Sequence, residues 1–154
     1  MTRPQTADTG RNERQRIIEA LAKAEQSVLE AAWTAVDPKP GHKAVRGPES
    51  GLVMIRGRIG GGGAPFNLGE ATVSRATVRL DSGEVGFGQT LGLAQRKAEL
   101  AALFDALGQR PEFTDMVETL VASIEADIAE QDAEHLRRTA ATRVDFFTVV
   151  RGED

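Results

Sequence analysis

The sequence contains no cysteine and no tyrosine, and its other aromatic side chains are one tryptophan and six phenylalanines. Without cysteine, the chain has no disulfide framework, no thiolate nucleophile, and no Cys-ligated zinc or iron–sulfur site. So few aromatic rings also make a poor surface for stacking bases or sugars. A disulfide-stabilised scaffold and thiol chemistry are therefore excluded.

An excess of basic residues and a long apolar run are also lacking. The 154 residues include 19 Lys and Arg against 23 Asp and Glu, which disfavours a generally basic nucleic-acid-binding protein. No stretch approaches the roughly 20 apolar residues of a membrane span, and the polar start of the chain has no secretory-signal pattern. We therefore expect a cytoplasmic protein with no nucleic-acid and no membrane partner.

Residue types that usually carry catalysis or bind metals are sparse. His42 and His135 are the only histidines, and neither has the His-Glu-x-x-His spacing of a zinc site. Ser74 and Ser82 lack the sequence context of a nucleophile elbow. The residues therefore nominate no catalytic group and no metal ligand.

The patterns that are present predict a single domain over residues 15–152, after a polar tail over residues 1–14 that we expect to be disordered. Apolar residues at helical spacing predict a helix from Gln15 to about Trp33 and a second from Leu93 to Leu107. A third, longer helix has its apolar stripe from Val117 to Ile128 and continues into the charged residues that follow.

Strand patterns occupy the region between about Leu52 and Val85. Val53 and Ile55 alternate with other residues, which predicts a strand with one buried face, and two further strands follow the glycine-rich loop. Residues 144–150 are apolar on both faces and predict a C-terminal strand. The expected fold class is α+β, with an antiparallel hairpin or meander and the C-terminal strand covered by about three α-helices.

The strongest local signal is RGRIGGGGAPFNLGE, residues 56–70, with four consecutive glycines. Bare backbone N–H groups in such a loop can approach an anion closely. The loop lacks the Gly-Lys-Ser/Thr ending of a Walker loop and is not followed by a helix start, so a nucleotide P-loop is disfavoured. A flexible connection between strands and an anion-binding loop both stay open.

Two large apolar residues, Phe66 and Leu68, follow the glycines. In a surface loop they are costly to solvate unless they fold back on the core or contact another protein. Both interpretations stay open on the sequence alone.

Four arginines flank the loop. Arg56 and Arg58 share one strand face, and Arg75 and Arg79 lie on the expected partner strand. If these side chains converge, they suit a phosphate or an acidic partner, whereas a solvated sheet face with cross-strand ion pairs is the alternative. The candidate binding residues are Arg56, Arg58, Gly60, Gly61, Gly62, Gly63, Phe66, Leu68 and Arg75.

One carboxylate falls inside the apolar C-terminal segment. Asp145 lies between Val144 and Phe146, so burial of this strand would require a partner for its charge. We expect a structural ion pair with Arg143 or Arg151.

Three segments together resemble the PhnG family of the bacterial carbon–phosphorus lyase system. They are GLVMIRGRIGGGGAPFNLGEATVSRATVRL (residues 51–80), AELAALFDAL (residues 98–107) and RVDFFTVVRG (residues 143–152). The ordered combination is more specific than any one segment, and the resemblance spans residues 14–152. One departure is the turn Gly92, Leu93 and Ala94, where a Gly-Arg-Asp tripeptide is expected, and Lys97 stands where His is common.

The resemblance implies a subunit of an assembly that acts on phosphonates. In the family, this subunit works with PhnH, PhnI and PhnL, which together displace adenine from ATP with an alkylphosphonate, and the radical enzyme PhnJ acts later. The resemblance implies a non-catalytic subunit of a hetero-oligomer that binds no cofactor of its own, with ATP as the substrate of the complex. The alternatives are a free-standing anion- or nucleotide-binding module and, more weakly, an RNA-binding protein.

Overall fold

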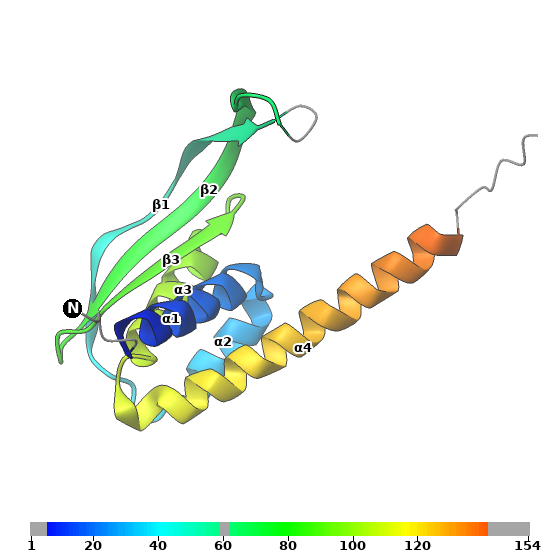
Figure 1. Cartoon of the computed structure of the whole chain (residues 1–154). Helices are drawn as coiled ribbons and strands as arrows, with labels where there is room; N and C mark the ends of the chain where they lie inside the picture. The colour runs from blue at the N-terminus through cyan, green and yellow to red at the C-terminus, as the bar shows by residue number, and fades with distance from the viewer. Residues whose placement is uncertain (1–5, 59–61, 142–154) are drawn as a thin grey trace, which may run out of the picture.

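The computed structural model describes residues 6–58 and 62–141 (Figure 1). Three strands form one antiparallel sheet in the order β1-β2-β3, and helices accompany it. The α+β prediction is therefore confirmed, whereas the expected C-terminal strand and Asp145 lie outside the described residues. The elements are α1 (Thr6–Lys23), α2 (Gln26–Ala35), β1 (His42–Gly57), β2 (Phe66–Leu80), β3 (Val85–Leu91), α3 (Gln95–Leu107) and α4 (Pro111–Ala141).

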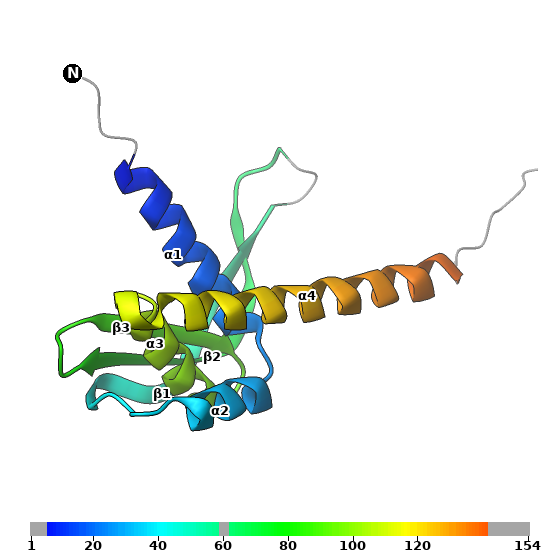
Figure 2. The same ribbon diagram turned by 90° about the horizontal axis from the view of Figure 1, so that it is seen from below.

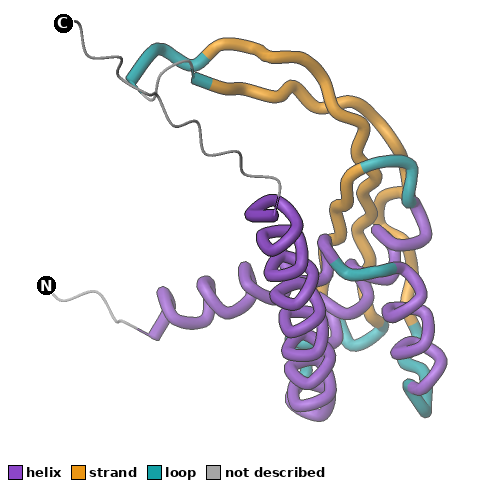
Figure 3. The backbone as a smooth tube through the Cα atoms, turned by 90° about the vertical axis from the view of Figure 1, so that its right-hand side faces the viewer, coloured by secondary structure: helices purple, strands orange, loops and turns teal. Residues whose placement is uncertain are grey.

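The strands differ greatly in length, and this difference shapes the molecule. β1 pairs with β2 from His42 opposite Leu80 to Gly57 opposite Phe66. β3 pairs with residues 73–79 of β2 and ends there. Residues 52–57 of β1 and 66–72 of β2 therefore continue as a two-stranded hairpin, which we call the arm. Figures 1 and 3 show the arm reaching past the helices.

Helix α3 lies directly on one face of the sheet because two glycines of β3 leave room for its backbone. A Cβ atom on Gly86 would lie 1.9 Å from the carbonyl oxygen of Ala102, and one on Gly88 would lie 1.9 Å from that of Ala98. Both alanines are fully buried. Any side chain larger than hydrogen would therefore push α3 off the sheet.

The buried core lies between this sheet face and the helices. Trp33 of α2 packs edge-on against Phe104 of α3, with ring centroids 6.4 Å apart. Val117 and Val121 bring the first half of α4 into the same core. The largest fully buried apolar side chains are Phe104, Leu21, Leu29, Leu80, Leu100, Leu103, Leu107, Val78, Val117 and Val121.

The N-terminal region differs from the expectation. The single helix predicted from Gln15 to Trp33 is two helices, α1 and α2, separated at the buried Ala24. Helix α1 begins at Thr6, so residues 6–14, expected to belong to a disordered tail, are helical. The physical reason is tertiary: Arg14 and Arg16 form ion pairs with α3 and α4, which no local pattern reveals. The described range thus contains four helices rather than about three.

Helix α4 has 31 residues and is about 46 Å long at 1.5 Å per residue. Its first part packs against α1 and α3, and its C-terminal part extends past the body of the domain (Figure 2). Among the described residues, no helix combines the length and apolar character needed to cross a bilayer.

Candidate functional site

The arm carries large apolar side chains that are exposed to solvent. Leu52 is 65% exposed, Met54 56% and Ile55 43%. Successive strand residues point to opposite faces, so Leu52 and Met54 occupy one face and Ile55 the other. The expectation of one buried face is therefore wrong here, because β3 and α3 end before the arm begins. Large exposed apolar side chains grouped on one protruding hairpin are typical of a contact site for another molecule.

Phe66 and Leu68 also belong to the arm, where they are 40% and 61% exposed. The register between β1 and β2 shifts after Ile55, which leaves Leu68 as the extra residue of a bulge. A Cβ atom on Gly57 would lie 2.4 Å from Leu68 Cδ1, so Leu68 lies over the backbone of β1. Both side chains are outside the buried core, and their docking on a partner stays a prediction.

Arg75 takes part in an ion pair across the sheet. Its Nε donates to Glu49 Oε1 at 2.7 Å, and Arg46 Nε donates to the same oxygen at 2.9 Å. The hydrogen bond from Arg75, followed by the charge of Arg46, holds the pKa of Glu49 below its usual value. This geometry matches the cross-strand ion pair that was the alternative interpretation of the arginines.

The four arginines do not converge on one patch. Arg56 lies opposite Asn67 and Arg75 opposite Glu49, eight residues apart along β2, or about 26 Å at 3.3 Å per residue. Arg79 lies farther still from the arm, opposite Lys43. Convergence fails because β1 and β2 are long extended strands, so their register places the arginines far apart along the hairpin.

The tip of the arm still presents positive charge. Arg56 Nε lies 3.4 Å from Asn67 Oδ1, and Arg58 is exposed. Neither arginine has an ion pair with a carboxylate in the part of the chain that the structure describes. Gly62 and Gly63 follow, and a Cβ on Gly62 would meet nothing within 4 Å, whereas Gly60 and Gly61 lie outside the described residues. A role for the glycine loop in binding an anion stays a prediction.

Sequence reasoning missed the position of Ser74, whose hydroxyl is fully buried. Ser74 Oγ donates to the carbonyl of Gly92 at 2.8 Å and accepts from the N–H of Ala94 at 2.9 Å. Ser50 Oγ lies 2.8 Å away on the neighbouring strand. Ser74 thus fixes the turn into α3, where this sequence departs from the expected Gly-Arg-Asp. Only the pairing of β1 with β2 reveals the contact between Ser50 and Ser74, since these residues are 24 positions apart in the sequence.

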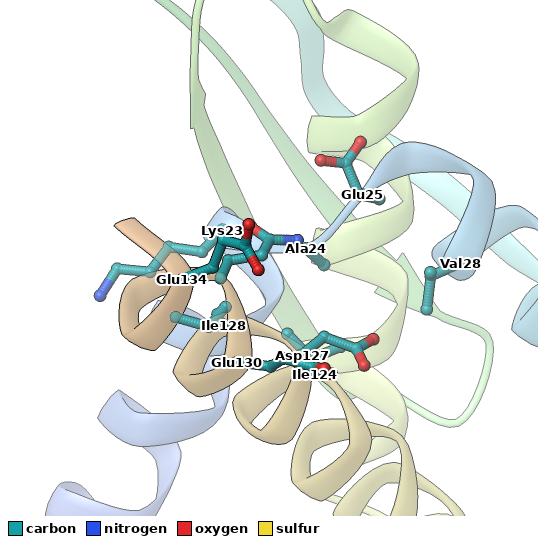
Figure 4. A pocket seen from close by; sticks show the side chains of 10 residues that line it. Lys23, Ala24, Glu25, Val28, Ile124, Asp127, Ile128, Glu130 and Glu134 are labelled. Atoms are coloured by element: carbon teal, nitrogen blue, oxygen red, sulfur yellow. The ribbon is translucent and has the colours of Figure 1, made fainter. Parts of the chain in front are cut away.

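An acidic depression lies where the end of α1 and the start of α2 meet α4 (Figure 4). Its volume is about 330 Å³, and Glu25, Asp127, Glu130 and Glu134 contribute to its lining. Within residues 6–58 and 62–141, no group of three or more His, Asp or Glu side chains is placed to hold a metal ion.

The fold and these surfaces define a class: an α+β domain with a helix-covered sheet and a protruding apolar arm, as is typical of a component of a larger assembly. The family model for phosphonate metabolism protein PhnG matches residues 12–152, and the chain belongs to this family. The chain is also 56% identical over 147 residues to the alpha-D-ribose 1-methylphosphonate 5-triphosphate synthase subunit PhnG of Rhizobium meliloti (strain 1021), covering 96% of this chain and 94% of that protein. The resemblance seen in the sequence is confirmed.

Proposed function

We propose that this chain is a non-catalytic subunit of the carbon–phosphorus lyase core complex in the cytoplasm. With PhnH, PhnI and PhnL it supports transfer of the ribose triphosphate moiety from ATP to an alkylphosphonate, which releases adenine and forms alpha-D-ribose 1-alkylphosphonate 5-triphosphate. PhnJ is the partner that acts afterwards. The observation that carries this proposal is the 56% identity to a named synthase subunit across nearly all of both chains.

The arm supports a role in assembly. Its apolar side chains would gain roughly 25 cal/mol for each Å² that a partner covers, and few charges oppose that burial. Phe66 and Leu68 are the anchors that we assign to this contact, since both are large, exposed and outside the core. Arg56 and Arg58, at the tip, are then available to a phosphate or to acidic groups, whether of a partner subunit or of a second copy of the chain.

Two carboxylates with lowered pKa values, Glu49 and Glu125, have structural rather than catalytic surroundings. General acid–base catalysis needs a group whose pKa is poised and which faces a cleft. The lowered pKa values of Glu49 and Glu125 arise mainly from hydrogen bonds with Arg75 and Arg16, which join structural elements to one another. The free-standing anion-binding alternative would use the glycine loop with its neighbouring arginines, and the register places Arg75 away from Arg56 at that loop.

The test is reconstitution with the partner subunits. ATP and methylphosphonate are supplied to the purified chain alone, to PhnH, PhnI and PhnL without it, and to all four together, and free adenine is measured. We expect release only from the complete set. Robust release by the chain alone would overturn the non-catalytic role, and undiminished release without the chain would overturn the subunit role.

A further inference from the structure

The outer edge of β1 has two halves with different character. In the body of the domain this edge contains Pro48, Lys43 and Arg46, and its register with β2 is interrupted on both sides of Arg46. Proline, charge and irregular pairing are the usual means by which proteins prevent a sheet edge from accepting another strand. This half of the edge is therefore protected against strand addition.

The other half of the same edge, from Ser50 into the arm, has none of this protection. From Ser50 to Ile55 every residue pairs with β2 without a shift, and the stretch contains no proline and no charged residue. Because β1 is the first strand in the sheet order, no strand among the described residues pairs with its outer edge. A strand with regular pairing, no charged side chains and unpaired backbone N–H and C=O groups is a template for one more strand.

The opposite edge of the arm is a poorer template. There β2 has passed the end of β3, but the bulge at Leu68 interrupts its pairing. A two-stranded hairpin is also marginally stable by itself, and a third strand with apolar cover is what usually stabilises one. The edge at Ser50 to Ile55 is thus the place where addition of a strand would gain most.

We propose that this edge accepts the C-terminal segment, residues 143–150, of a second copy of the chain, so that two copies exchange these strands. The segment has the sequence RVDFFTVV, whose alternate positions are apolar on both faces. The arm likewise has apolar side chains on both faces, with Leu52 and Met54 on one and Ile55 on the other. An added strand of this pattern would extend both apolar faces of the arm.

Charge complementarity supports the same occupant. Asp145 is the single acidic residue in the segment, and Arg56 and Arg58 at the tip of the arm have no carboxylate partner among the described residues. Burial of Asp145 among apolar neighbours requires a cation, and a guanidinium supplies one with two hydrogen bonds. Exchange between copies therefore gives the carboxylate an arginine from the arm.

The position of α4 explains why the strand comes from another copy. Glu134 is the last α4 residue that lines the depression beside α1, and the helix continues to Ala141 past the body of the domain. Only residue 142 separates Ala141 from the segment. At 3.8 Å per Cα step, the segment therefore begins within about 8 Å of Ala141. In Figures 1 and 2 the end of α4 stands clear of the arm of its own chain. This separation favours a neighbouring molecule over the same chain as the acceptor in the proposed exchange.

Cysteine crosslinking tests this exchange cleanly, because the chain has no cysteine of its own. One preparation bears Met54→Cys in the arm, and a second, isotopically labelled, bears Val149→Cys in the segment. The two are mixed, allowed to exchange and treated with a short bismaleimide, and mass spectrometry identifies products that join a labelled to an unlabelled chain. Lys43→Cys, in the protected half of the same edge, replaces Met54→Cys as the matched control.

We expect crosslinks between chains for Met54→Cys at least tenfold above those for Lys43→Cys. The unmodified chain should sediment as a dimer, and a chain ending at Ala141 should sediment as a monomer with unchanged circular dichroism. If that truncated chain fails to fold, full-length Phe147→Asp provides the same comparison. A monomeric full-length chain, a dimer that survives truncation, or crosslinks for Met54→Cys no more abundant than those for Lys43→Cys would each overturn the exchange. Crosslinking and sedimentation use no partner subunit. The strand exchange can therefore be overturned while the reconstituted complex still releases adenine, and adenine release can fail while the exchange is observed.

Discussion

Arg14 and Asp105 form a two-point ion pair between α1 and α3, with Arg14 Nε 2.9 Å from Asp105 Oδ1 and Nη2 2.8 Å from Oδ2. Asp105 is 1% exposed, and its Oδ2 also accepts the backbone N–H of Phe87 at 2.8 Å. Arg14 Nη2 in turn donates to the carbonyl of Val85 at 2.9 Å. This pair joins two helices to β3 and helps to hold residues 6–14 as a helix.

Removing the cation should therefore destabilise the whole domain. Arg14→Ala leaves the carboxylate of Asp105 buried with a single backbone donor, and we expect a loss of about 2 to 3 kcal/mol in the free energy of unfolding. The value lies below that of a fully buried pair because Arg14 is partly exposed. Urea denaturation measures this change. The control is Arg16→Ala, whose ion pairs with Glu118 and Glu125 are half-exposed, and an equal loss in both variants would contradict the assigned importance of Asp105.

The close contact between β3 and α3 predicts a large effect from one methyl group. Gly88→Ala places a Cβ 1.9 Å from the carbonyl oxygen of Ala98, so α3 must move off the sheet. We expect the unfolding free energy to fall by about 3 kcal/mol, the upper end of overpacking costs, with a lower melting temperature. Gly51→Ala in β1 is the matched control, because its Cβ would meet nothing within 4 Å. A melting temperature for Gly88→Ala equal to that of Gly51→Ala would show that α3 does not pack as described.

Acid should weaken the contact between α1 and α4. Two hydrogen bonds of 2.8 Å from Arg16 hold the pKa of Glu125 below its usual value. This carboxylate therefore contributes stability above the unfolded pKa of about 4.3, and the contribution disappears as pH falls through the lower pKa of the folded state. The difference in melting temperature between the wild type and Glu125→Gln should be present at pH 7 and shrink steadily as the pH falls below about 4.

A control on the same helix separates this effect from general acid denaturation. Glu130→Gln removes an exposed carboxylate of α4 that has no ion pair among the described residues. Its difference from the wild type should stay small over the same pH range. A gap for Glu125→Gln that persists undiminished near pH 3 would mean that the ion pair with Arg16 is not its source.

The sequence anticipates those parts of the fold that depend on local pattern. Alternation in β2 and β3, the turn after Leu80 and the apolar stripe of α4 all arise from near neighbours, and the structure contains each of them. The predicted start of the first helix is wrong because its N-terminal part is tied to the domain by the ion pair of Arg14 with Asp105, 91 residues away. The part of β1 before Leu52 is not predicted as a strand, because Pro48 and nearby charges interrupt its alternation.

The candidate site was anticipated in its residue types and not in its geometry. Phe66 and Leu68 stood out because large apolar residues are unusual beside a glycine-rich loop, and both are exposed on the arm. The arginines were expected together because spacing along one strand cannot show which residue of its partner lies opposite. That register depends on the length of the hairpin and on the bulge at Leu68.

Truncation of Phe66 should separate binding from folding. Phe66 is 40% exposed on the arm, so Phe66→Ala removes few internal contacts, and we expect the melting temperature of the isolated chain to change little. If Phe66 anchors the arm on PhnI, its loss should weaken that association by about 2 kcal/mol or more, roughly thirtyfold in Kd. Titration of the variant chain against purified PhnI measures the loss.

Leu136→Ala is the control for this change, because Leu136 is 71% exposed on α4 and lies far from the arm in the sequence. It removes apolar surface of similar kind, so any loss of affinity that it shares with Phe66→Ala comes from a general effect and not from anchoring. A large drop in the melting temperature of Phe66→Ala with an unchanged affinity for PhnI would mean that the ring stabilises the hairpin itself. The contact of the arm with its partner would then have to depend on Leu52, Met54 and Leu68, whose side chains are more exposed than that of Phe66.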